Sequence, residues 1–164
     1  MTHAPKQAGA RRSIVTTSGE REVRIERIFD APRDRVWRAM TEPDLVARWW
    51  GRGNRLTIEK FEPARGGHWR FVEHTDRGDF GFEGRFREVK APERIVRTFE
   101  WDGMPGHPCV ETMTLEDLGD GTTRYVSVSL FMLGEERDGM LASGMETGLN
   151  ESHRALDRVL AGMA

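Results

Sequence analysis

Few side chains in this sequence combine reactivity with a spacing that would bring them into an apolar interior. The first is His153, which lies in the C-terminal stretch 134–164 among apolar residues that follow one another by three or four positions. The pKa of a histidine lies near neutrality, so His153 could act as a general base or bind the polar end of a ligand. The same position also suits a structural histidine whose ring is hydrogen-bonded within the core.

Charged residues on apolar strand faces are the second feature. Alternation places Glu73, Arg97 and Glu111 each on the same strand face as large apolar residues. A sealed core accepts such groups only when they are paired and hydrogen-bonded, whereas the lining of a ligand cavity needs a few of them. Arg97 and Glu111 lie on consecutive strands, so they could form a buried ion pair or hold the carboxylate of a ligand. Both interpretations stay open.

The remaining reactive residues have no partners that the sequence can identify. Cys109 is the only cysteine, which excludes an internal disulfide, and no neighbouring residue supplies an activating base. His68, His74 and His107 lack metal-ligand spacing, so we expect no metal site. The glycines at 51–53 follow a helix instead of preceding one, and no nucleotide loop, triad order or redox motif is present. We therefore expect no cofactor.

The composition indicates a polar chain of ordinary globular size. Of its 164 residues, 37% are hydrophobic and 32% are charged, and the formal net charge is -2. This length allows a sizeable core, and the charge balance gives no reason to expect a nucleic acid as partner. No apolar run reaches the roughly 18 residues that span a membrane, and the N-terminus lacks the apolar segment of a secretory signal. We predict a cytoplasmic protein without integral membrane contact.

Hydrophobic periodicity predicts one domain over residues 14–164, preceded by a flexible segment at 1–13. A first strand is followed by two short helices, about six further strands and one long helix. This order predicts an α+β fold in which an antiparallel sheet of about seven strands has its helices gathered at one face. The strands are expected at 22–31, 55–63, 67–74, 79–90, 93–101, 109–118 and 123–132, and the helices at 32–40, 41–51 and 134–164.

Five stretches carry a resemblance to a known family: "RIFDAPRDRVWRAMTEPDLVARWWG", "EPARGGHWRFV", "FEGRFREVKAPERIVRTFEW", "TLEDLGDGTTR" and "SGMETGLNESHRALDRVL". In this order, from about Val23 to Leu160, they resemble the stand-alone bacterial members of the activator-of-heat-shock-protein-ATPase-like family. That family belongs to the START-like, or SRPBCC, superfamily of helix-grip domains. The resemblance implies a curved sheet that grips the C-terminal helix around an apolar cavity, open where the two short helices meet the sheet.

The resemblance also implies which residues would line that cavity. His153 would be a polar group within it, and Gly144 and Gly148 would let the sheet or another backbone approach the helix. The expected ligand-binding residues are Trp37, Trp50, Trp69, Phe71, Glu73, Phe82, Phe86, Arg97, Phe99, Trp101, Glu111, Met113, Leu141, Met145, Leu149 and His153.

The resemblance brings no catalytic set, because the superfamily includes carriers, cyclases, oxygenase domains and chaperone activators. We predict that the protein binds a small hydrophobic or amphipathic molecule, as a carrier, a sensor or a stress-related protein. Two alternatives stay open: a cyclase- or hydrolase-type enzyme with His153 as base, and a protein-interaction module that binds a chaperone or a second copy of the chain. The separate N-terminal domain of the eukaryotic chaperone activator has no counterpart here, which argues against chaperone activation.

Overall fold

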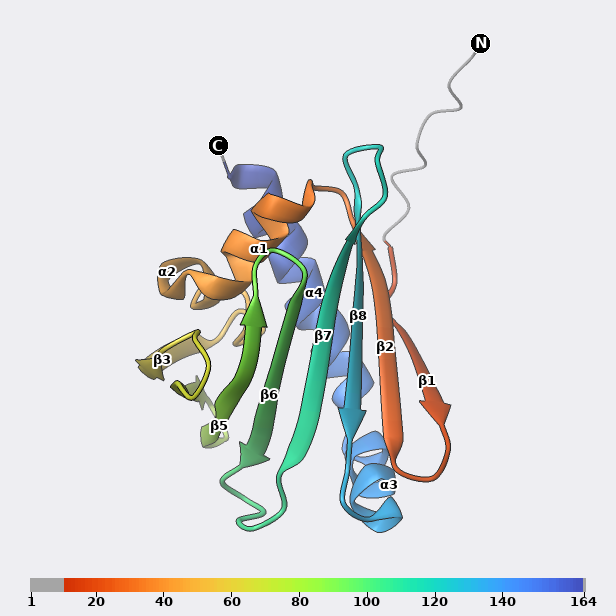
Figure 1. Cartoon of the computed structure of the whole chain (residues 1–164). Helices are drawn as coiled ribbons and strands as arrows, with labels where there is room; N and C mark the ends of the chain where they lie inside the picture. The colour runs from red at the N-terminus through yellow and green to blue at the C-terminus, as the bar shows by residue number, and fades with distance from the viewer. Residues whose placement is uncertain (1–10, 164) are drawn as a thin grey trace.

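Eight strands form one antiparallel sheet in the computed structural model, which describes residues 11–163 (Figure 1). The strands are β1 (Ile14–Ser18), β2 (Glu22–Phe29), β3 (Arg55–Phe61), β4 (His68–Thr75), β5 (Gly78–Lys90), β6 (Arg94–Trp101), β7 (Cys109–Asp117) and β8 (Thr123–Leu130). Their spatial order is β1-β2-β8-β7-β6-β5-β4-β3. The helices are α1 (Arg33–Thr41), α2 (Pro43–Val46), α3 (Gly134–Ala142) and α4 (Met145–Gly162).

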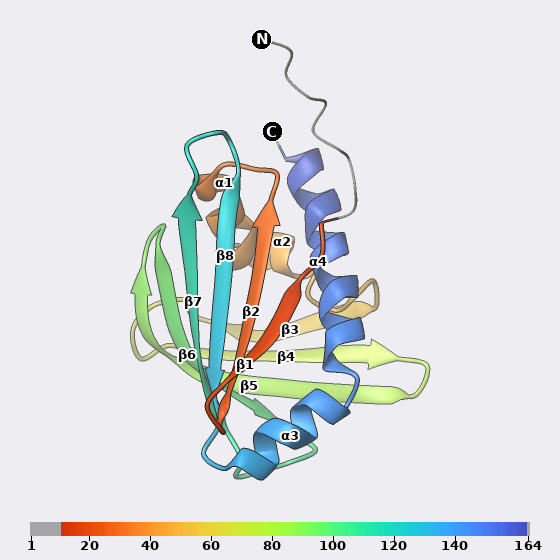
Figure 2. The same ribbon diagram turned by 90° about the vertical axis from the view of Figure 1, so that its right-hand side faces the viewer.

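The sheet is strongly curved, and α4 lies on its concave side. Figure 2 shows β3, β4 and β5 running across the direction of β2, β7 and β8, with α4 along the open side of this bend. The pairing of β5 with β6 shifts register between Phe86 and Glu88, and that of β3 with β4 between Ile58 and Lys60. Such bulges bend a strand and increase its twist, so they help the sheet to curve around the helix.

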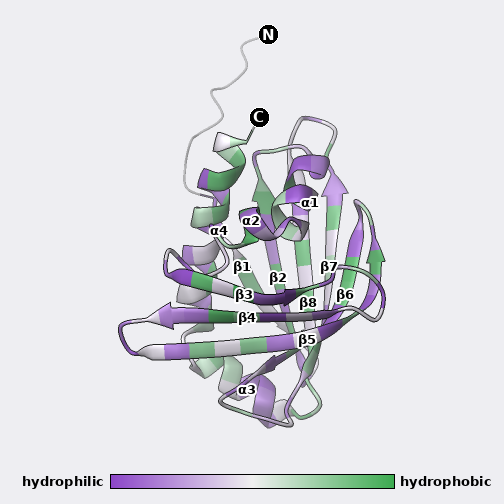
Figure 3. Cartoon of the chain, turned by 90° about the vertical axis from the view of Figure 1, so that its left-hand side faces the viewer, coloured by the Kyte–Doolittle hydropathy of each residue, from purple (hydrophilic) through white to green (hydrophobic). Residues whose placement is uncertain are grey.

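Burial alternates from residue to residue along β2, β4 and β8. In β2, Val23, Ile25 and Phe29 are buried together with Arg27, while the residues between them are half-buried. Figure 3 shows the corresponding hydrophilic and hydrophobic bands along β5. The concave face therefore supplies the core, as the α+β prediction required.

The predicted single helix over 134–164 is divided in two. Ser143 ends α3, and Gly144 has a φ of 82°, a left-handed conformation that glycine adopts without strain. Helical spacing of apolar residues continues across the break because both parts are helical. Gly144 therefore ends a helix, and the expectation that it admits a close approach of the sheet is wrong.

The sheet has eight strands, where the sequence indicated about seven. The additional strand is β1, so the two short helices follow the second strand and not the first. Most of the expected flexible segment 1–13 lies outside the described residues, although Ser13 is described and is buried. Within residues 11–163, no helix is long and apolar enough to cross a membrane.

Candidate functional site

Five of the predicted site residues form one aromatic cluster on the concave face of the sheet. The ring of Trp50, from the turn after α2, lies 5.2 Å from Phe71 and 5.0 Å from Phe82, measured between centroids. Trp69 lies 5.0 Å from Phe71 and 5.8 Å from Phe99. Trp69 and Phe71 are fully buried, whereas Trp50, Phe82 and Phe99 are half-buried. The aromatic cluster thus has a sealed layer and a layer that reaches solvent.

Arg97 and Glu111 form the ion pair that their position on consecutive strands predicts. The two residues are register partners on β6 and β7, and Arg97 Nε donates to Glu111 Oε2 at 3.1 Å. The guanidinium carbon of Arg97 also lies 4.2 Å from the centroid of the Trp69 ring, a cation–π distance. The two side chains are 11% and 16% exposed, so the pair is not sealed from solvent.

Gly84 allows Trp69 to lie under Arg97. A Cβ at this position would lie 2.7 Å from Trp69 Nε1 and would collide with the carbonyl oxygen of Thr98. Because Gly84 has no side chain, the indole Nε1 of Trp69 can donate to the carbonyl oxygen of Thr98 at 3.1 Å. The glycine in β5 therefore fixes the orientation of the aromatic ring that supports the ion pair.

Both carboxylate oxygens of Glu73 already accept hydrogen bonds from neighbouring side chains. Its carboxylate accepts from Arg52 Nε at 3.1 Å, from Arg52 Nη2 at 3.0 Å and from Asn54 Nδ2 at 3.1 Å, and the residue is 3% exposed. Arg52 is a non-glycine residue with a φ of 59°, a costly conformation that these contacts maintain. A Cβ at Gly148 would lie 3.1 Å from Arg52 Nη1. The absence of a side chain at Gly148 therefore makes room for the side chain of Arg52, and not for the sheet or another backbone as expected.

His153 lies in a different part of the interior from the aromatic cluster. Its ring packs edge-on against Phe29 and Tyr125, and its Nδ1 lies 2.5 Å from Ser13 Oγ. The residue is 2% exposed. Burial, with a smaller effect from the positive charge of Arg27, lowers the pKa of His153 to about 3. The ring is therefore neutral near pH 7, a weak base, and closed off from solvent.

The other predicted site residues fall into three levels of exposure. Phe86 and Met113 are buried in the core, and Trp101, at the end of β6, is 37% exposed. Four residues are half-buried against the core: Trp37, Leu141, Met145 and Leu149. Leu141 lies on α3 and not on the same helix as Met145 and Leu149, because of the break at residue 144.

A polar group near the start of β7 carries no signal in the sequence. Glu136 Oε1 lies 2.7 Å from His107 Nδ1, and Glu136 Oε2 is buried with no partner among the described residues. Burial first, and then the negative charges of Glu111 and Glu136, raise the pKa of the Cys109 thiol. A buried thiol with a raised pKa is unreactive, which agrees with an inert Cys109. Residues 11–163 contain no group of acidic, histidine and cysteine side chains that could hold a metal ion.

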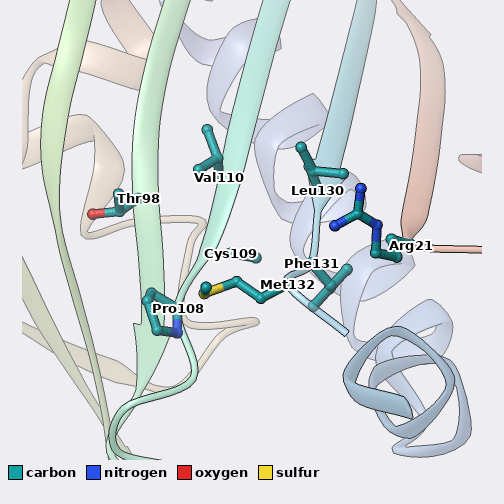
Figure 4. A pocket seen from close by; sticks show the side chains of 8 residues that line it. All are labelled: Arg21, Thr98, Pro108, Cys109, Val110, Leu130, Phe131 and Met132. Carbon is teal, nitrogen blue, oxygen red and sulfur yellow. The ribbon is translucent and has the colours of Figure 1, made fainter. Parts of the chain in front are cut away.

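A shallow depression of about 220 Å³ lies on the outer side of the sheet, where β7 begins and β8 ends (Figure 4). Val110 and Leu130, which are register partners, line it and alternate with residues that face the core. None of the predicted site residues contributes to it. Its lining consists of Arg21, Thr98, Pro108, Cys109, Val110, Leu130, Phe131 and Met132.

Comparison with known proteins gives the family. Residues 30–161 match the family described as activator of Hsp90 ATPase homolog 1-like protein. This chain belongs to that family. Its helix-grip fold is that of the START-like, or SRPBCC, superfamily, as the resemblance implied. No curated protein matches the sequence.

Solved structures from several bacteria share this fold. A crystal structure from Rhodobacter sphaeroides is 28% identical, with a TM-score of 0.84, and the match covers 93% of this chain and 99% of that one. A solution structure from Arthrobacter aurescens is 26% identical, with a TM-score of 0.81 and 92% coverage of both chains. A Mycobacterium smegmatis protein, at 18% identity, shows the fold alone, with a TM-score of 0.82 and coverage of 92% and 98%.

Proposed function

We propose that this protein binds a small amphipathic molecule between the concave face of the sheet and α4. The supporting observation is the exposure of apolar side chains that pack against the core. Core side chains of a well-packed domain are sealed from water, yet several hydrophobic residues that pack against the core here are only half-buried. Those that belong to the predicted ligand-binding set are Trp37, Trp50, Phe82, Phe99, Leu141, Met145 and Leu149.

The two sides of this region offer different surfaces to a ligand. The sheet contributes flat aromatic rings, and the helices contribute flexible aliphatic side chains and a methionine, which adapt to irregular shapes. Removing about 200 Å² of apolar surface from water would contribute on the order of 5 kcal/mol before the cost of association. Even without that cost, 5 kcal/mol corresponds to a dissociation constant of only about 0.2 mM, so tighter binding requires a larger apolar contact or hydrogen bonds to polar groups of the site.

The enzymatic alternative has little support from the described residues. A general base must come within hydrogen-bond reach of the substrate, but His153 is sealed and bonded to Ser13. Cys109 is buried and its thiol is held in the protonated form. Binding without turnover is the function that this arrangement favours.

Native mass spectrometry of freshly purified protein, followed by titration with the uncharged fluorescent apolar dye N-phenyl-1-naphthylamine, tests the proposal. Leu149→Trp adds a ring to the inward side of α4 and should weaken dye binding at least about tenfold, because it fills the space that the dye needs. The control is Leu130→Trp, which adds the same ring to the outer depression.

The two variants distinguish the inner site from the outer one. Wild-type protein should take up one dye molecule or carry one lipophile, and Leu130→Trp should bind like wild type. Loss of binding in Leu130→Trp with full binding in Leu149→Trp would place the ligand on the outer face and overturn the proposal. Absence of any bound lipophile or dye in wild-type protein would also overturn it.

A further inference from the structure

Arg27, Arg52 and Arg97 each pair with an acidic residue, and of these three, within the described residues 11–163, Arg97 alone leaves both of its terminal nitrogens without a hydrogen bond. Arg27 donates from Nη2 to Asp157 and from Nη1 to Ser13. Arg52 donates from Nε and Nη2 to one carboxylate. Arg97 donates only from Nε. Among residues 11–163, neither Nη1 nor Nη2 of Arg97 has a hydrogen-bond partner, and neither is sealed from solvent.

Glu111 has a free acceptor beside those free donors. Its Oε2 receives the hydrogen bond from Arg97, while its Oε1 has no hydrogen-bond partner in the described part of the chain and is not sealed. An ion pair within a partly closed interior therefore presents unsatisfied donors and an unsatisfied acceptor side by side. Leaving such groups without partners is costly once a ligand excludes water.

The charges around this pair determine which ligand group could satisfy it. Arg97 carries one positive charge, whereas Glu111 and Glu136 carry two negative charges, and both of these act on the thiol of Cys109. Glu136, which contacts His107 and acts on Cys109, is 10% exposed, and its buried Oε2 lacks a partner among the described residues. An organic anion would accept hydrogen bonds from the guanidinium of Arg97, but the two carboxylates would repel it.

We infer that the ligand is uncharged and that its polar end carries an acceptor next to a donor, as a primary amide does. This inference rests on the proposed function and names the ligand class for the same site. The carbonyl oxygen accepts from the Nη groups of Arg97, and the N–H donates to Glu111 Oε1. The apolar part of the ligand lies against the aromatic cluster, because Trp69 supports Arg97 and contacts Phe99.

Three probes that share one aromatic tail test the inference: 1-naphthaleneacetamide, methyl 1-naphthaleneacetate and 1-naphthaleneacetate. Isothermal titration of wild-type protein at pH 7 should rank the amide first, the ester second and the carboxylate last. The ester keeps the acceptor but lacks the donor, and the carboxylate adds charge. The amide should bind at least about tenfold more tightly than the carboxylate, because its N–H donates to the charged Glu111, whereas the carboxylate offers no donor and is repelled by Glu111 and Glu136.

The variant Glu111→Gln keeps the shape of the side chain and removes its charge. The preference for the amide over the carboxylate should then fall to less than about threefold. The control is Glu116→Gln on the same strand, where the carboxylate faces outward and pairs with Arg124, and the preference should stay at its wild-type value.

Each outcome decides a separate question. If the carboxylate binds wild-type protein as tightly as the amide, or Glu111→Gln leaves the preference unchanged, the inference is wrong and the binding site stands. If none of the three probes nor the dye binds, the proposed function itself fails. The ranking on wild-type protein holds even if Glu111→Gln does not fold.

Discussion

The pH dependence of stability tests the placement of His153. The pKa of this residue is about 3 in the folded protein and lies near 6.5 in the unfolded chain. Because the folded state binds the proton more weakly, the unfolded state holds about one more proton between these two values. Stability is therefore complete above pH 6.5 and falls as the pH is lowered toward 3.

The magnitude follows from the slope of about 1.36 kcal/mol per pH unit for one proton. Between pH 6.5 and pH 4.5, His153 should thus remove about 2.7 kcal/mol from the free energy of unfolding. Carboxylates also titrate in this range, so the wild-type curve alone is not diagnostic. The variant His153→Asn retains a polar group near Nδ1 but cannot titrate, and the difference between the two curves isolates the histidine.

Urea denaturation monitored by tryptophan fluorescence, at half-unit steps from pH 7 to pH 4.5, provides the measurement. The wild-type protein should lose about 2 to 3 kcal/mol more than His153→Asn over this range. Ser13→Ala removes the hydrogen-bond partner but keeps the ring, so its curve should be lower and equally steep. Parallel curves for wild type and His153→Asn would show that His153 is not buried in the neutral form, and would return it to consideration as a base.

Local patterns in the sequence were sufficient for most of the architecture. Strict alternation identified β2, because a half-buried strand exposes every second residue. β1 lacks that signal: it lies at an edge of the sheet and four of its five residues are exposed. The division between α3 and α4 depends on Gly144, whose left-handed φ interrupts the backbone without disturbing the spacing of apolar residues.

The candidate site was predictable only where partners lie on consecutive strands. Arg97 and Glu111 meet because β6 and β7 form a hairpin. Glu73 was predicted as a ligand group, but its partner Arg52 comes from a turn whose backbone conformation no periodicity reveals. His153 follows the apolar residues at helical spacing because its ring packs in the core. Its hydrogen-bond partner Ser13 lies 140 positions away in the sequence, so no local pattern could identify it.

Two further substitutions test how the site is built. Gly84→Ala should lower the free energy of unfolding by at least about 2 kcal/mol, because the new Cβ meets Thr98 and Trp69, whereas Gly139→Ala on α3 has open space and should be neutral or stabilising; urea denaturation measures both. Glu73→Gln keeps an acceptor for Arg52 but removes the negative charge, and it should lower the free energy of unfolding by about 2 kcal/mol, less than for a fully buried pair because the Arg52 side chain is 37% exposed. A loss below about 1 kcal/mol in the same denaturation assay would mean that the left-handed turn is stable without Glu73, and would leave that carboxylate available to a ligand.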